Sequence, residues 1–226
     1  MPKSKLIVAL DMDSLGKAEE LVSALKDSVS VFKVGSRLFT SCGAEVIRRI
    51  NAQGAKVFLD LKFHDIPSVT ASAVRAAQAH GVFALSLHTL GGMKMLEECA
   101  KIKMRPLLWG VTVLTSMDDD GLRRIGIEKN VRDEVLSLVS LARDAGLDGI
   151  VCSPREIEDA RERAGKNFTI VTPGIRPFGS AKDDQARTMT AREATGKGSD
   201  YIVVGRPVVE AKDPLEAVRG ILKEIS

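Results

Sequence analysis

The stretch KVFLDLKFHDIPSVTASAVRAAQAHGVFALSLH, residues 56–88, contains a complete strand–helix–strand unit. It begins with the apolar run KVFLDL (56–61), which is typical of a buried strand. VTASAVRAAQAHG (69–81) then places apolar residues at helical spacing and closes on glycine, a residue favoured just after a helix. FALSLH (83–88) is the next apolar run. Two buried strands joined by an amphipathic helix are expected to lie parallel in one sheet.

The same alternation continues along the chain. The other apolar runs are LIVALD (6–11), VFKVG (31–35), LLWGVTVL (107–114), GIVCS (149–153), FTIVT (168–172) and YIVVG (201–205). Eight strand–helix units fit an α/β fold of the (β/α)8 TIM barrel type, which takes about 200 residues or more. A doubly wound open sheet is the rival, but no GxGxxG follows the first run and such sheets rarely need eight units. We therefore predict one barrel domain over residues 1–226.

Composition narrows the functional classes. The 226 residues are 44% hydrophobic and 28% charged, as expected for a folded chain with one sizeable core. The net charge is +3 and no Lys/Arg-rich run occurs, so we expect no nucleic-acid partner. The first apolar run is too short for a signal peptide or a membrane span, so we expect a cytoplasmic protein away from membranes. Cys42, Cys99 and Cys152 are far apart, which favours reduced thiols over a disulfide or zinc site.

Charged residues follow the predicted strands at their carboxyl ends, where barrels of this type carry out their chemistry. Asp11 ends the first strand, Lys33 lies near the end of the second, and DLKFHDIP (60–67) closes the third with the pattern Asp60-x-Lys62-x-x-Asp65. Residues 60 and 62 share a face on a strand but not on a helix. Two charges pointing into the barrel mouth cost desolvation energy, so we interpret them as functional.

Structural explanations exist for the single residues. Asp11 could help to cap a helix, although Asp13 and Ser14 are better placed to do so. Lys33 could point outward with its amine in solvent. His64 and His88 are interpreted as hydrogen-bonded structural residues, because no second ligand lies at metal spacing beside either one.

The loops after the last two predicted strands have the features of a phosphate site. They contain PGIRP (173–177), DDQAR (183–187) and VGRP (204–207). Gly205 leaves a backbone amide open to close approach, and Arg206 is expected to open a helix whose amino end favours an anion. Residues 176–187 are polar and long for such a loop, so we predict a lid that closes over the phosphate.

Together these motifs resemble a known family. ALD (9–11), FKVG (32–35), DLKFHDIP, LTS (114–116), PGIRP, DDQ (183–185) and VGRP occur in order. The chain resembles orotidine 5′-phosphate decarboxylase of the short bacterial type, from residue 6 to near the carboxyl terminus. The resemblance implies decarboxylation of orotidine 5′-phosphate to uridine 5′-phosphate in pyrimidine synthesis, with no metal and no organic cofactor. It also implies a homodimer with shared active sites.

The resemblance implies a role for each matching residue. Lys62 would donate a proton to C6 of the pyrimidine, and Asp60 would face the departing CO2. Lys33 would link Asp60 to the ribose, Asp11 would bond the ribose hydroxyls, and Asp65 would reach into the neighbouring subunit's site. The remaining contacts, to the base and to the phosphate and its loop, would come from Thr115, Arg176, Gln185, Gly205 and Arg206.

One position departs from the family pattern. Four residues after the last Asp of the motif the family usually has Thr, whereas this chain has Val69 followed by Thr70. The missing contact, to a ribose hydroxyl in the partner's site, would require a local change of register or a substitute such as Ser68.

Two other functions compete with the decarboxylase. Sister barrels, which are sugar-phosphate aldolases or decarboxylases, also carry DxKxxD, but they use Mg²⁺ and have an acidic residue where this chain has Lys33. A non-catalytic phosphate-binding barrel is the second alternative. It would bind uridine 5′-phosphate and leave orotidine 5′-phosphate unchanged.

Overall fold

The structure is a computed structural model that describes residues 5–176 and 189–225. Eight parallel strands pair in sequence order, and β8 pairs with β1 to close the barrel. This confirms the predicted (β/α)8 barrel and excludes the open sheet. The strands are β1 (Leu6–Ala9), β2 (Val31–Gly35), β3 (Lys56–Phe63), β4 (Ala84–His88), β5 (Leu107–Val111), β6 (Gly149–Val151), β7 (Thr169–Thr172) and β8 (Tyr201–Val204).

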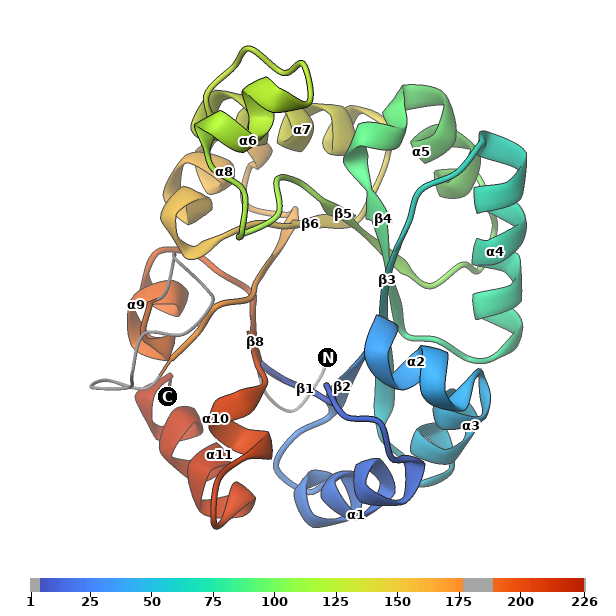
Figure 1. Cartoon of the computed structure of the whole chain (residues 1–226), viewed down its shortest axis with the longest axis vertical. Helices are drawn as coiled ribbons and strands as arrows, with labels where there is room; N and C mark the ends of the chain where they lie inside the picture. The colour runs from blue at the N-terminus through green and yellow to red at the C-terminus, as the bar shows by residue number, and fades with distance from the viewer. Residues whose placement is uncertain (1–4, 177–188, 226) are drawn as a thin grey trace.

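Helices surround the barrel on its outer side, as the view down the barrel in Figure 1 shows. The α-helices are α1 (Leu15–Leu25), α2 (Ser36–Cys42), α3 (Glu45–Ala52), α4 (Pro67–Ala79), α5 (Gly92–Ala100), α6 (Asp119–Arg124), α7 (Val131–Asp144), α8 (Ile157–Ala164), α9 (Ala191–Gly196), α10 (Arg206–Val209) and α11 (Pro214–Glu224). Two short 3-10 helices, η1 (Thr89–Gly91) and η2 (Pro154–Glu156), follow β4 and β6. None of the described helices is long and apolar enough to cross a membrane.

Two of the differences between the observed and the predicted strand ends bear on the site. β3 continues to Phe63, past the predicted end at Leu61, and β5 stops at Val111, short of the predicted end at Leu114. The extension of β3 carries Lys62 within the strand rather than after it. The early end of β5 releases Val113, Leu114 and Thr115 into the loop above the barrel, where they line the pocket described below.

Apolar side chains close the barrel beneath its mouth. Phe58 of β3 and Trp109 of β5 lie edge to face inside the barrel, with ring centroids 4.6 Å apart. Both are buried and pack in one cluster with inward-facing residues of the other strands, including Val203 of β8. A second, larger apolar layer lies between the strands and the helices. The packed interior therefore closes the bottom of the pocket, and the polar groups lie at the carboxyl ends of the strands.

Candidate active site

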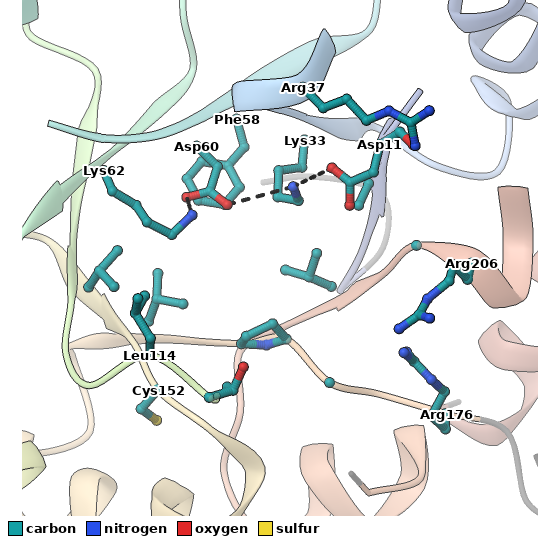
Figure 2. A pocket seen from close by; sticks show the side chains of 18 of the residues that line it. Asp11, Lys33, Arg37, Phe58, Asp60, Lys62, Leu114, Cys152, Arg176 and Arg206 are labelled. Carbon is teal, nitrogen blue, oxygen red and sulfur yellow. Dashed lines mark hydrogen bonds and ion pairs between the residues drawn. The ribbon is translucent and has the colours of Figure 1, made fainter. Parts of the chain in front are cut away.

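A pocket of about 470 Å³ opens at the carboxyl ends of the strands. Eight of the predicted site residues line it: Asp11, Lys33, Asp60, Lys62, Thr115, Arg176, Gly205 and Arg206. Figure 2 shows the labelled charged residues at the edges of this pocket, with Lys62 on one side of the view and Arg176 and Arg206 on the other. Residues far apart in the chain meet here because every parallel strand ends at the same mouth.

The end of β3 is irregular, and this irregularity carries Lys62. Leu59 pairs with Leu85 of β4 and Phe63 pairs with Leu87, so three residues of β3 lie opposite Ser86 alone. Within this bulge Lys62 has a φ of 51°, in the left-handed region that non-glycine residues rarely adopt. Its backbone N–H donates a hydrogen bond of 2.8 Å to Ser86 Oγ. Backbone strain of this kind concentrates at functional sites.

Four charged side chains form an alternating row along the pocket (Figure 2). Lys62 Nζ lies 3.0 Å from Asp60 Oδ1. Lys33 Nζ lies 3.6 Å from Asp60 Oδ2 and 2.9 Å from Asp11 Oδ1. The side chains of Asp60 and Lys33, in the middle of the row, are only 13% and 12% exposed. Lys33 therefore points into the mouth and not into solvent.

The carboxyl group of Asp60 is kept charged by its neighbours. Burial alone raises its pKa, but the charges of Lys33 and Lys62 outweigh that effect, and the pKa lies below its usual value. Ser86 contributes in the same direction, because its hydroxyl donates a hydrogen bond of 2.9 Å to Asp60 Oδ1. Asp60 is thus a buried, ionised carboxylate facing a pocket.

Two residues of this site escaped the sequence analysis. Arg37, which follows β2, lines the pocket, donates to the backbone carbonyl of Asp11 at 3.2 Å and forms an ion pair with Asp13. It thereby holds the loop that carries Asp11. Ser86 is fully buried in β4 and contacts both Asp60 and Lys62. Neither residue belongs to a charged motif at a strand end, so no local pattern indicated them.

The opposite side of the pocket is cationic. Arg176 follows β7 and Arg206 is the first residue of α10, directly after Gly205. As predicted, Arg206 opens a helix. Both guanidinium groups lie on the same side of the pocket in Figure 2. Gln185 and the predicted lid, apart from Arg176 itself, lie outside the described residues.

Asp65 does not line the pocket of its own chain. Its carboxylate accepts a hydrogen bond of 2.7 Å from the backbone N–H of Ile66, just before Pro67 begins α4. Ile66 and Val69 beside it are 62% and 47% exposed. Thr70 is buried, and its hydroxyl donates to the backbone carbonyls of Asp65 and Ile66. Thr70 therefore does not take the surface position of Val69.

The two histidines near the motif lie against each other. The rings of His64 and His88 are stacked with centroids 5.4 Å apart. Burial, followed by the proximity of His64 and Lys62, lowers the pKa of His88, and its Nδ1 accepts a hydrogen bond from the backbone N–H of Leu90. The neutral imidazole thus caps η1, which agrees with a structural role. Among residues 5–176 and 189–225, no group of three or more His, Cys, Asp or Glu side chains is arranged to hold a metal ion.

Comparisons with known proteins agree with the barrel fold and identify a family. A family model described as the Orotidine 5′-phosphate decarboxylase / HUMPS family matches residues 4–221. The chain is 48% identical to orotidine 5′-phosphate decarboxylase of Nitrosococcus oceani, over 100% of this chain and 99% of that protein. It is 47% identical to the enzyme of the same name from Moorella thermoacetica, over 99% of this chain and 92% of that protein. The crystal structure of orotidine 5′-phosphate decarboxylase from Lactobacillus acidophilus is similar with a TM-score of 0.86 and 37% identity, covering 98% of each chain.

Proposed function

We infer that this chain decarboxylates orotidine 5′-phosphate, because it belongs to the orotidine 5′-phosphate decarboxylase / HUMPS family. The family description names two groups, but the full-length relatives at 44% to 48% identity are named as the decarboxylase. The product, uridine 5′-phosphate, places the enzyme in pyrimidine biosynthesis. The observation that carries this function is the alternating row of Asp11, Lys33, Asp60 and Lys62 in the barrel mouth.

The reaction is difficult because it leaves negative charge on a ring carbon. When the bond between C6 and the carboxylate breaks, CO2 leaves and the electron pair stays on C6 of a ring that offers it no electron sink. In our proposal the ammonium group of Lys62 lies beside C6, attracts this charge and then transfers a proton to it. The amine of Lys62 regains its proton from solvent after the product leaves. Uridine 5′-phosphate and CO2 are then the only products.

The size of this attraction can be bounded. Two unit charges about 4 Å apart attract by about 4 kcal/mol at an effective dielectric constant of about 20. That energy corresponds to about a thousandfold in rate, whereas enzymes commonly accelerate reactions at least about a millionfold. Lys62 therefore needs help from interactions that exclude water and orient the ring. Asp60 would face the departing carboxylate, and the relief of their like-charge contact is a smaller contribution, since such ground-state effects are contested.

The rest of the pocket would bind the nucleotide. Lys33 lies between Asp60 and Asp11, so it would link Asp60 to the ribose, and Asp11 would bond the ribose hydroxyls. Thr115 would contact the base from the loop after β5. Arg176, Gly205 and Arg206 lie on the cationic side and would hold the phosphate. The family resemblance adds Gln185 as a further contact. In this arrangement the phosphate, which would contribute binding energy, lies on the other side of the pocket from the carbon that reacts.

We also propose that the active unit is a homodimer to which Asp65 contributes in trans. Asp65 is not part of its own pocket, although it belongs to the motif that supplies Asp60 and Lys62. The exposed apolar side chains of Ile66 and Val69 lie next to it, and exposed apolar surface is typical of an interface. An interface with two-fold symmetry would place each Asp65 in the other subunit's site.

One experiment separates the candidate functions. Purified protein is mixed with orotidine 5′-phosphate, and loss of the orotate chromophore is followed with and without an added metal chelator. We expect equal turnover in both samples. Activity that the chelator removes and Mg²⁺ restores would favour a sister-barrel chemistry. Binding of uridine 5′-phosphate without any turnover of orotidine 5′-phosphate would identify a non-catalytic barrel.

A further inference from the structure

We propose that Ser86 is a positioning residue that holds both the Asp60 carboxylate and the backbone of Lys62 in their working arrangement. The inference rests on the proposed function and adds to it a residue that touches neither the pocket nor the substrate. Ser86 is 0% exposed in the middle of β4 and is not among the residues that line the pocket. Any effect of Ser86 on catalysis must therefore pass through its two neighbours on β3.

The pairing of β3 with β4 gives Ser86 a unique position on β4. Because Leu59 pairs with Leu85 and Phe63 with Leu87, Ser86 is the one β4 residue opposite the bulge that contains Asp60 and Lys62. The regular backbone hydrogen bonding between β3 and β4 is interrupted there. The side chain of Ser86 forms hydrogen bonds to β3 instead. A buried hydroxyl can accept and donate at once, and Ser86 does both.

The two hydrogen bonds of Ser86 have opposite directions. Its oxygen accepts from the backbone N–H of Lys62 at 2.8 Å, and its hydroxyl donates to Asp60 Oδ1 at 2.9 Å. The first bond anchors the backbone of Lys62 in its left-handed conformation, with φ at 51°. An anchored backbone directs the long lysine side chain toward the pocket.

The second bond determines the rotation of the Asp60 carboxylate. Oδ1 receives both the Ser86 hydroxyl and Lys62 Nζ, which leaves Oδ2 directed at Lys33 Nζ, 3.6 Å away. Without the hydroxyl, the carboxylate would be free to rotate between its two lysine partners. Ser86 thus links the backbone that carries the proton donor to the carboxylate beside it.

Four variants test the proposal, starting from wild-type turnover of orotidine 5′-phosphate. Ser86→Ala removes both hydrogen bonds and should lower kcat at least about tenfold, while affinity for uridine 5′-phosphate stays within about threefold. Ser199→Ala is the control, because Ser199 is also buried and its hydroxyl bonds Thr172, away from Asp60 and Lys62. It should keep kcat within about threefold.

Ser86→Thr and Ser86→Val form the second, matched pair. The two substitutions add nearly equal volume to the same buried position, but only threonine retains a hydroxyl. We expect Ser86→Thr to turn over at least about tenfold faster than Ser86→Val, at similar thermal stability. Equal kcat values for this pair, or a Ser86→Ala variant with a wild-type kcat, would overturn the positioning role alone. A wild-type protein without turnover would instead overturn the proposed function, and this inference with it.

Discussion

Lys62 occupies a backbone conformation that residues other than glycine adopt at a cost of about 1–2 kcal/mol. Lysine has a Cβ atom, so this cost is not avoided as it would be with glycine at position 62. The fold supports it through the bulge against β4 and the hydrogen bond to Ser86. Such support is expected where the position of one side chain matters more than local stability. At the scale of single residues, the site depends on the positions of the Lys62 ammonium group and the Asp60 carboxylate.

Replacing Lys62 tests the central charge of the mechanism. In the proposed mechanism the ammonium acts mainly on charge that appears in the transition state, so its loss should affect kcat far more than binding. We expect Lys62→Ala to lower kcat by at least about a thousandfold, with affinity for uridine 5′-phosphate largely retained. Steady-state kinetics and calorimetric titration measure the two effects. Residual activity within tenfold of wild type would remove Lys62 from the donor role.

Gly35 leaves room for the Lys33 and Asp11 side chains, which form the end of the charged row opposite Lys62. A Cβ atom at this position would come 2.9 Å from Lys33 Nζ and 3.1 Å from Asp11 Oδ1. The φ of Gly35 is −93°, which alanine adopts without strain, so the effect of Gly35→Ala falls on these two side-chain ends. We expect the variant to fold with a melting temperature close to wild type and to bind uridine 5′-phosphate at least about tenfold more weakly.

Gly220 offers a control for that substitution, because a Cβ there would meet no atom within 4 Å and the residue lies in α11, away from the pocket. Gly220→Ala should leave nucleotide affinity unchanged. If Gly35→Ala binds uridine 5′-phosphate as tightly as Gly220→Ala does, the Lys33–Asp11 pair tolerates displacement and its proposed contact with the ribose is wrong.

At the scale of elements, the two ends of the barrel have different tasks. The carboxyl ends of the strands carry the pocket, whereas ion pairs tie strands and helices together at the amino ends. Arg161 of α8 donates to the backbone carbonyls of Phe168 and Gly198, at 2.7 Å and 2.8 Å, and pairs with Asp200. Asp200 in turn accepts from the backbone N–H of Ile170. This cluster links α8 to the starts of β7 and β8.

Arg161→Met should therefore reduce stability without changing catalysis. The variant keeps an apolar stem but loses hydrogen bonds from a charged donor to backbone carbonyls that are part-buried. After a discount for partial exposure, we expect a loss of about 2 kcal/mol, or roughly 4–8 °C in melting temperature for a chain of this size. Kinetic constants of the folded variant should match wild type.

The matched control is Arg48→Met, because Arg48 is exposed on α3 and its ion pair is with Glu45 of the same helix. Its melting temperature should equal that of wild type. Equal melting temperatures for the Arg161 and Arg48 variants would show that the amino-end cluster does not stabilise the barrel.

The loops after β7 and β8 carry a prediction about substrate binding. If Arg206 holds the phosphate, its loss should reduce kcat/KM for orotidine 5′-phosphate far more than for the same nucleoside without phosphate. Arg37→Ala is the matched control: Arg37 lines the pocket but supports the Asp11 loop, so its loss should reduce both activities alike. Equal losses on both substrates for Arg206→Ala would contradict the phosphate role.

At the scale of the whole molecule, the position of Asp65 bears on assembly, because this residue does not line the pocket of its own chain. Asp65 belongs to the same eight-residue motif as Asp60 and Lys62, yet Pro67 starts α4 immediately after it and the carboxylate bonds to Ile66. A two-fold interface at this edge would bring each Asp65 to the other subunit's pocket. Assembly would then be a condition of activity.

Mixed dimers test this arrangement. Homodimers of Lys62→Ala and of Asp65→Ala should both be inactive. In a mixed dimer with shared sites, one site carries both substitutions and the other carries neither, so activity returns. Random pairing makes about half of the dimers mixed, and about a quarter of all sites should then be wild type in composition. Co-refolding the two variants should approach that fraction of wild-type turnover. A verified heterodimer as inactive as its parents would place Asp65 within its own site.

The amino-acid sequence was sufficient to predict the barrel and the four charged residues of the row. Alternating apolar strands and amphipathic helices are local patterns, and eight of them in order leave few other ways to bury the strands. The period of two along a strand predicted Asp60 and Lys62 on one face, and their side chains do meet, although through a bulge and not through regular strand alternation. The shared mouth of parallel strands brought Lys33 and Asp11 into the same row.

The contacts that hold this row became visible only in the folded barrel. Ser86 meets Lys62 across 24 positions of sequence, and Arg37 meets Asp11 across 26. These contacts depend on strand register and on a bulge, which arise from pairing between strands and leave no periodic signal within either one. The left-handed backbone of Lys62 was equally hidden, because no glycine marks it. Local patterns specify which elements form, whereas closure of the barrel specifies which side chains meet.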